Sequence, residues 1–338
     1  MKKITTLPAL IIVSAALLLT ACEKALLGGD PAENPQEVFD HLWTDLRNRY
    51  SYFELKNIDW EAVKLQYAPR IREDMGEIEL FEVLADLLFE LEDGHVNLTS
   101  SFNRSRNWEW SQNFPLNYNQ GIIDRNYLGT EFWISGPLRH HIIDSILYIN
   151  CRSFGGVLSR DDADAVAERA AGLAGVIIDV RSNGGGNLGN ALRLASVFTE
   201  SAYTYGRVRI KNGTCPDCFS SWTDLRVNTR SGPVYTGEVV VLTNRESYSS
   251  TTYFAEMMRV NPRAVLIGDR TGGGGGSPAF GELPNGWTYR FSSTQAVNND
   301  GLHFEHGIPV DSEAELEKSD EDSGIDTIIE TALEILRE

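Results

Sequence analysis

The chain has 338 residues, of which 42% are hydrophobic and 23% charged, a composition typical of globular proteins with one large domain or two modest ones. Its formal net charge of −18 argues against a nucleic-acid partner, because phosphates require a basic face. Neither a metal nor an organic cofactor is implied. A zinc site is disfavoured because the sequence offers no second Cys-x-x-Cys and no histidine pair beside Cys215–Cys218.

The N-terminus predicts export. Two lysines precede an apolar run over residues 7–19, which is too short for a membrane-spanning helix. The run ends in LTAC at Cys22, which resembles the lipobox of bacterial lipoproteins, although a buried cysteine near a chance apolar run is the alternative. We therefore expect residues 1–21 to be a signal peptide and residues 22–36 a tether. Lipidation of Cys22 would hold the protein on a membrane of the bacterial cell envelope.

The other cysteines fit a protein outside the cytoplasm. Cys215 and Cys218 suggest a disulfide in a small loop, a redox pair or half of a metal site, and a structural disulfide is the favoured interpretation. Cys151 follows an apolar stretch and is expected to be a buried free thiol.

Hydrophobic periodicity divides the chain into a helical region over residues 37–98 and a core over residues 99–338. Residues 100–145 lack helical periodicity and predict strands and loops, and residues 311–322 predict a solvated loop. From residue 145 strands alternate with helices, which favours a largely parallel α/β core. The expected strands cover 145–150, 176–180, 239–242 and 264–267. The expected helices cover 160–171, 187–199, 250–260 and 324–336, the last with Ile325, Ile328, Ile329, Ala332 and Ile335 or Leu336 facing inward.

The most informative segment runs from 238 to 258. A buried strand is followed by a polar turn and by a helix that begins near Ser249 or Ser250. A serine at such a turn exposes its hydroxyl beside the first N–H groups of the helix, where an oxyanion is stabilised. Ser249 is therefore a candidate nucleophile with Ser247 as its near competitor, although serine is also an ordinary helix cap.

Three further segments carry candidate site residues. Residues 175–189 form a strand followed by three glycines, which free the backbone to present N–H groups to a phosphate or an oxyanion. A phosphate loop is disfavoured because neither GK[ST] nor GxGxxG spacing is present. His95 lies in a glycine turn and is a candidate base or a solvent-exposed turn histidine. Glu305 precedes a Gly/Pro turn and either orients a base or decorates a loop.

These segments occur in an order that resembles the S41 peptidases, which include the C-terminal processing proteases and the tricorn-core group. The resemblance covers roughly residues 35–311 and implies an α/β, ClpP/crotonase-like fold. It implies Ser249 as nucleophile and His95 as base, with Glu305 orienting the base or binding the substrate amine. It further implies an oxyanion hole made of the Ser250 N–H and that of Gly184 or Gly185.

The chain also departs from the family pattern. The processing proteases use a lysine base where Gly274 stands here, so a Ser–Lys dyad is not expected. The serine that precedes the histidine in tricorn-type sites is Gly94 here. The interval 99–145 is too short for a PDZ domain. The aromatic residues of 108–110 (Trp108 and Trp110) and of 114–118 either line a substrate groove or pack in the core.

The leading hypothesis is a lipid-anchored serine endopeptidase that cleaves envelope peptides or unfolded proteins. The alternative is a catalytically silent protein that binds peptides or hydrophobic ligands on the same fold. A crotonase-type acyl-CoA enzyme is disfavoured because CoA belongs to the cytoplasm. Relatives of this kind often assemble, so a homo-oligomer is also expected. A histidine base predicts activity that falls as pH drops through the mid-6 range, and a flat profile from pH 5 to 8 would count against His95.

Overall fold

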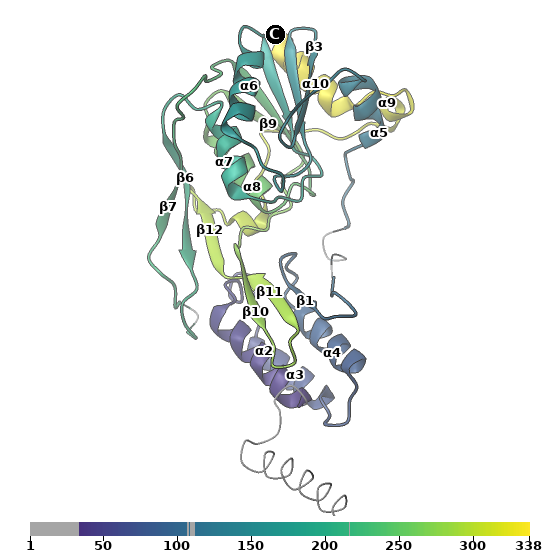
Figure 1. The fold of residues 1–338 in the computed structure, drawn as a ribbon, viewed down its shortest axis with the longest axis vertical. Coiled ribbons are helices and arrows are strands. Elements are labelled where there is room, and N and C mark those ends of the chain that lie inside the picture. Colours follow the sequence, from purple (N-terminus) through teal and green to yellow (C-terminus); the bar gives the residue numbers. More distant parts are fainter. Residues whose placement is uncertain (1–33, 107, 109–111, 216) are drawn as a thin grey trace, which may run out of the picture.

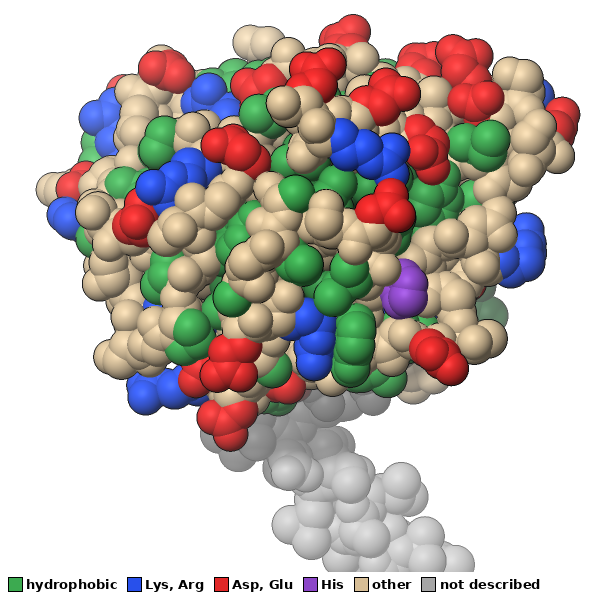
Figure 2. Space-filling model, turned by 90° about the horizontal axis from the view of Figure 1, so that it is seen from above, with side chains coloured by type: hydrophobic (Ala, Val, Ile, Leu, Met, Phe, Trp, Pro, Cys, Tyr) green, Lys and Arg blue, Asp and Glu red, His purple; other side chains and the backbone are tan. Residues whose placement is uncertain are grey.

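The computed structural model describes residues 34–106, 108, 112–215 and 217–338. Cys22, the predicted signal peptide and most of the predicted tether lie outside this range, so lipidation and anchoring stay predictions. Among the described helices, none is both long and apolar enough to span a membrane. Figure 1 shows a small helical part below a larger layered part, and acidic side chains are spread over the upper end of the molecule (Figure 2).

The larger part is built on a seven-stranded sheet with the strand order β13-β9-β8-β5-β4-β3-β2. The strands from β4 to β13 pair in parallel and β2 and β3 add an antiparallel edge. The sheet contains β2 (Trp133–Ser135), β3 (Leu138–Ile143), β4 (Ile146–Cys151), β5 (Gly175–Asp179), β8 (Glu238–Thr243), β9 (Ala264–Gly268) and β13 (Ser312–Glu313). Its parallel core is the α/β architecture that the alternating pattern predicts.

Helices cover both faces of this sheet. Alternate residues of β5 and β8 point to opposite sides, so Val176 and Val239 pack against one helix layer while Ile177 and Val240 pack against the other. The first layer contains α6 (Arg160–Ala170), α7 (Leu188–Ser196) and α8 (Ser250–Val260). The second contains α5 (Gln120–Ile122), the π-helix η4 (Ile123–Leu128) and α10 (Thr327–Arg337). Burial on both faces explains why the central strands are continuous apolar runs.

The helical part is completed by strands from the distant C-terminal half. It contains α2 (Pro35–Arg49), α3 (Trp60–Tyr67), η2 (Ala68–Arg70), α4 (Glu77–Phe89), β1 (Asn97–Thr99), β10 (Pro278–Glu282) and β11 (Thr288–Ser292). Trp287, Tyr289 and Phe291 share one apolar cluster with the helices. The strands β6 (Tyr203–Ile210), β7 (Thr223–Val227) and β12 (Thr294–Asn298) form a third sheet, and β12 directly follows the hairpin (Figure 1).

Some sequence predictions about elements are wrong. Residues 120–128 are helical rather than strand or loop, and 318–322 form the short helix α9 (Lys318–Asp322). In the last helical segment Ile325 is 39% exposed rather than inward, Leu336 rather than Ile335 is the buried member of the predicted pair, and Leu333 is buried as well. The helix starts at Thr327 after an Asp326 cap, and this phase places Leu333 on the inner face instead.

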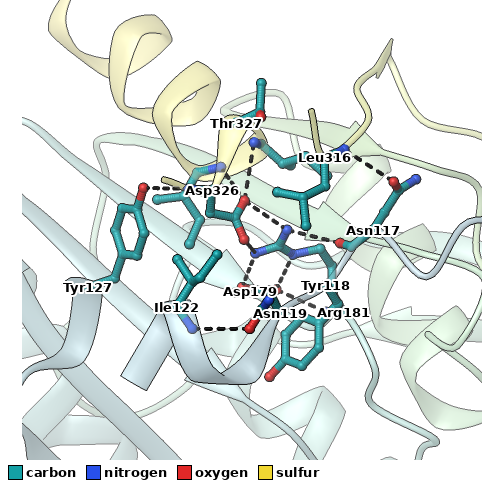
Figure 3. Close-up of polar contacts among 12 residues, drawn as sticks. Asn117, Tyr118, Asn119, Ile122, Tyr127, Asp179, Arg181, Leu316, Asp326 and Thr327 are labelled. Carbon is teal, nitrogen blue, oxygen red and sulfur yellow. Dashed lines mark hydrogen bonds and ion pairs between the residues drawn. The ribbon is translucent and has the colours of Figure 1, made fainter. Parts of the chain in front are cut away.

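A buried arginine joins the sheet to the C-terminal helix. Arg181 is 0% exposed and binds Asp179 through Nε and Nη2, at 2.9 and 2.7 Å. Two further bonds of 3.0 Å reach Asp326, whose carboxylate also accepts the N–H groups of Ile328 and Ile329 at the start of α10 (Figure 3). Because a buried charge needs partners, this cluster fixes where the last helix docks.

Replacing the arginine tests that dependence. Arg181→Met would leave two buried carboxylates without a counter-ion, and we expect it to lower the free energy of unfolding by about 3–5 kcal/mol. Arg337→Met is the matched control, because its pair with Asp144 is exposed and is worth about 1 kcal/mol or less. Urea denaturation of both variants measures the difference, and similar small losses would show that the buried cluster is not needed for stability.

Candidate active site

Ser249 lies in the turn between β8 and α8 with the backbone angles φ 61° and ψ −124°. This left-handed conformation is unusual for a residue with a side chain, and surrounding contacts must hold it. The Ser249 N–H donates to the Gly273 carbonyl at 2.9 Å, and Gly185 packs so closely that a Cβ there would lie 2.8 Å from the Ser249 Cβ. The turn leaves the serine half-buried at the start of α8, as the strand-turn-helix pattern predicts.

The competitor Ser247 is placed differently. It is 0% exposed, and its hydroxyl donates to the Val180 carbonyl at 2.8 Å and accepts the Asn244 N–H at 3.1 Å. These bonds tie the turn to the end of β5 and leave the hydroxyl of Ser247 no route to a substrate.

His95 meets Ser249 from the helical part of the molecule. Its Nε2 lies 3.0 Å from the Ser249 Oγ, although the two residues are 154 positions apart. The backbone N–H of His95 donates to the Asp93 carboxylate at 2.8 Å, and the Arg290 side chain of β11 donates to the His95 backbone carbonyl at 2.8 Å. Burial lowers the pKa of His95 to about 4, against the neighbouring charge of Asp93, which raises it. The imidazole is therefore neutral at pH 7, as a general base must be.

The glycine turn after β5 presents one free N–H group next to the serine. The Gly185 N–H donates to the Asn183 side chain at 2.9 Å, so of the two candidates for the oxyanion hole the structure favours Gly184. Within the described part of the chain the Gly184 N–H donates to no acceptor. The Ser250 N–H belongs to the first turn of α8, where amide groups lack partners within the helix.

Glu305 lies close to the site but is engaged elsewhere. Its carboxylate binds Lys56 Nζ at 2.9 Å and accepts the Gly275 N–H at 3.1 Å. Burial and then the charge of Asp93 raise the pKa of Glu305 above its usual range, while Lys56 opposes the shift. No hydrogen bond joins Glu305 to His95 in the described structure, and the His95 Nδ1 has no partner there. The structure thus shows no direct contact through which Glu305 sets the tautomer of the base.

A cavity of about 760 Å³ opens beside the serine turn. Trp108, Phe114 and Leu116 line one side, and Gly184 and Glu305 belong to its polar lining. Two of the aromatic residues singled out in the sequence, Trp108 and Phe114, therefore lie at the cavity, which can hold an apolar group beside Gly184, whereas Trp110 lies outside the described residues.

Tyr248 and Trp108 occupy the space at the two positions where the family pattern is broken. A Cβ at Gly274 would overlap the Tyr248 ring, so the lysine of the processing proteases would have no space there. A Cβ at Gly94 would overlap the Trp108 ring and lie 2.8 Å from the Tyr248 hydroxyl. The Tyr248 ring also lies 5.1 Å from the His95 ring, measured between centroids. Tyr248 and Lys56 belong to no motif that marks a role, and only their spatial positions reveal them.

The other three described cysteines are placed as the sequence predicts. Cys215 and Cys218 form a disulfide, and Cys151 is a buried free thiol. Among the described residues, no group of three or more His, Cys, Asp or Glu side chains is arranged to hold a metal ion.

A serine–histidine pair beside free N–H groups on a parallel α/β core defines a serine hydrolase site. The family model described as peptidase family S41 matches residues 145–314, and that of the tricorn protease C1 domain matches residues 31–89. A solved putative peptidase from Parabacteroides merdae is 36% identical, with 90% of this chain and 96% of that chain covered and a TM-score of 0.85. The chain belongs to peptidase family S41.

More distant proteins are similar as well. Mature CPAF is 12% identical, with 91% of this chain and 97% of that chain covered and a TM-score of 0.68, and it shares the fold. The tricorn protease is 16% identical, with 91% of this chain and 37% of that chain covered and a TM-score of 0.58. A probable CtpA-like serine protease of Staphylococcus haemolyticus is 26% identical over 136 residues. That match spans 40% of this chain but only about a quarter (26%) of the relative.

Replacing Gly274 tests whether Tyr248 excludes a side chain. Gly274 has φ 73°, and Gly274→Ala adds left-handed strain and overlap with the Tyr248 ring, so we expect a loss of about 2–4 kcal/mol of unfolding free energy. Gly286→Ala is the control, because Gly286 has φ 79° with open space around it and adds strain alone, about 1–2 kcal/mol. Equal losses of unfolding free energy in the two variants, measured by chemical denaturation, would show that the Tyr248 ring moves aside for the added methyl group.

Proposed function

We propose that the protein is a lipid-anchored serine endopeptidase of the bacterial cell envelope that hydrolyses peptides or unfolded proteins. The observation that carries the proposal is the 3.0 Å separation of Ser249 Oγ and His95 Nε2, with a neutral imidazole. Membership of family S41 and the CtpA-like relatives support a peptide-bond substrate. The anchor rests on the sequence around Cys22 alone.

The geometry supports an acyl-enzyme mechanism. Ser249 Oγ attacks the peptide carbonyl carbon while His95 Nε2 takes the hydroxyl proton, and the N–H groups of Gly184 and Ser250 stabilise the oxyanion. His95 then returns the proton to the leaving amine as the C–N bond breaks. Water, deprotonated by the same imidazole, releases the new carboxylate and restores the serine. Loss of one oxyanion donor lowers the rate of such hydrolases on the order of 10²–10³-fold.

Glu305 fits a positioning role in this site. Its bond to the Gly275 N–H holds the glycine segment 273–275, whose Gly273 carbonyl in turn accepts the Ser249 N–H. Lys56 balances the buried carboxylate. Glu305 also lines the cavity, so binding of a substrate amine is the alternative role for its carboxylate.

A catalytically silent peptide-binding protein is the second candidate. The aromatic cavity of about 760 Å³ favours it, because such a cavity can bind an apolar side chain without chemistry. The serine–histidine contact favours the enzyme, since a binder does not need a neutral base beside the hydroxyl. A homo-oligomer remains part of the proposal, and the oligomeric state is independent of the choice between these functions.

A fluorophosphonate probe separates the two candidates. We expect a single adduct on Ser249 by intact mass and peptide mapping, because only an activated hydroxyl reacts with this probe. Ser249→Ala removes the adduct, and His95→Ala slows labelling by about 10²–10⁴-fold. The control is Ser250→Ala, whose hydroxyl is buried without a partner among the described residues and which keeps the backbone N–H. A folded wild type that stays unlabelled would favour the binding protein.

The low pKa of His95 changes the expected pH dependence. The base works in its neutral form, so the labelling rate should be level from pH 8 to about 5 and fall by half near pH 4. Burial thus moves the expected midpoint from the mid-6 range predicted from the sequence to near pH 4, and a level profile from pH 5 to 8 becomes the outcome expected for His95 as the base. The profile is measured by stopping the labelling reaction after fixed times at each pH and counting the adduct. Tryptophan fluorescence at the same pH checks that the protein is folded. A midpoint near 6.5 would mean that the histidine is solvated during reaction.

A further inference from the structure

A second cavity, of about 380 Å³, lies beside α7 and is lined by four arginines. Arg160 comes from the start of α6, Arg193 from α7, and Arg226 and Arg230 from β7 and the segment after it. None of the described residues that line this cavity is acidic. Such a gathering of like charges is unexpected in a chain of net charge −18.

The four arginines differ in what already holds them. Arg193 donates to the Leu158 carbonyl, and Arg230 donates to the Pro233 carbonyl at 2.9 Å and pairs with Asp164. A neutral carbonyl orients a guanidinium but does not neutralise its positive charge. Only Arg230, which pairs with Asp164, therefore has its charge compensated. The exposed side chains of Arg160 and Arg226 make no hydrogen bond or ion pair with any described residue. Three of the four positive charges are thus without a counter-charge.

We propose that this arginine cavity binds a compact phosphate-bearing anion. The fork of each guanidinium matches two oxygens of a phosphate, and a phosphate group offers more anionic oxygens in a small volume than a single carboxylate. Arg193 and Arg230 are already oriented by their backbone partners, and the exposed side chains of Arg160 and Arg226 supply two further guanidinium groups for the ligand. The hydroxyls of Thr229 and Ser231 add neutral donors at its edge. The negative charge of the rest of the protein disfavours long polyanions such as nucleic acids.

The ligand is either a soluble phosphate compound or a phospholipid headgroup, and the site is independent of the peptidase chemistry. Calorimetric titration of the purified chain with inorganic pyrophosphate represents the first source. Titration with water-soluble dihexanoyl phosphatidylglycerol, below its micelle concentration, represents the second, with the zwitterionic choline lipid as its control.

We expect one site per chain for at least one of the two anionic probes. The double variant Arg160→Ala/Arg226→Ala should raise its Kd by about tenfold or more, because two charge-assisted contacts are lost. Arg125→Ala removes an exposed arginine outside this cavity and should leave the Kd unchanged. Fluorophosphonate labelling of Ser249 should proceed at the same rate in the wild type and in both variants. Absence of saturable binding by both probes, or equal weakening in Arg125→Ala, would overturn the proposal.

Discussion

The buried charge of Arg181 is the constraint on which the rest of the site depends. Because the guanidinium is removed from water, Asp179 and Asp326 must face it, which curls the chain after β5 and docks α10. The same turn continues into the glycine segment, where the Tyr248 N–H donates to the Asn183 carbonyl at 3.0 Å. An interior ion pair thereby determines where the oxyanion turn meets the nucleophile turn, although it never touches a substrate.

The second constraint is the docking of the helical part on the sheet. His95 reaches Ser249 because the turn after α4 is held by Arg290, which belongs to β11, and because β1 pairs with β11. The hairpin that supplies Arg290 comes from residues far beyond the nucleophile in sequence. The apolar cluster of Trp287, Tyr289 and Phe291 with the helices therefore stabilises the distance between the two reacting groups. Looser packing there would separate the histidine from the serine without changing either residue.

The sequence predicts what depends on local pattern. The parallel core follows from apolar runs and helix periodicity, and the ordered motifs place Ser249 and His95 in one site. It does not predict the β10–β11 hairpin in the helical part, because long-range pairing leaves no local signal, nor the π-helix at 123–128. The Lys56 partner of Glu305 and the low pKa of His95 also depend on burial, which is a property of the tertiary packing.

Tyr248, with Trp108 beside it, explains why two departures from the family pattern occur together. Its ring lies where a side chain at Gly274 would extend, and its hydroxyl lies near the space that a side chain at Gly94 would enter. Tyr248 thus excludes the lysine of one branch, and the Trp108 ring together with the Tyr248 hydroxyl excludes the serine of the other. The His95 imidazole is therefore buried beside the Tyr248 ring, and this burial lowers its pKa. The loss of two polar neighbours and the neutral state of the base are consequences of the same packing.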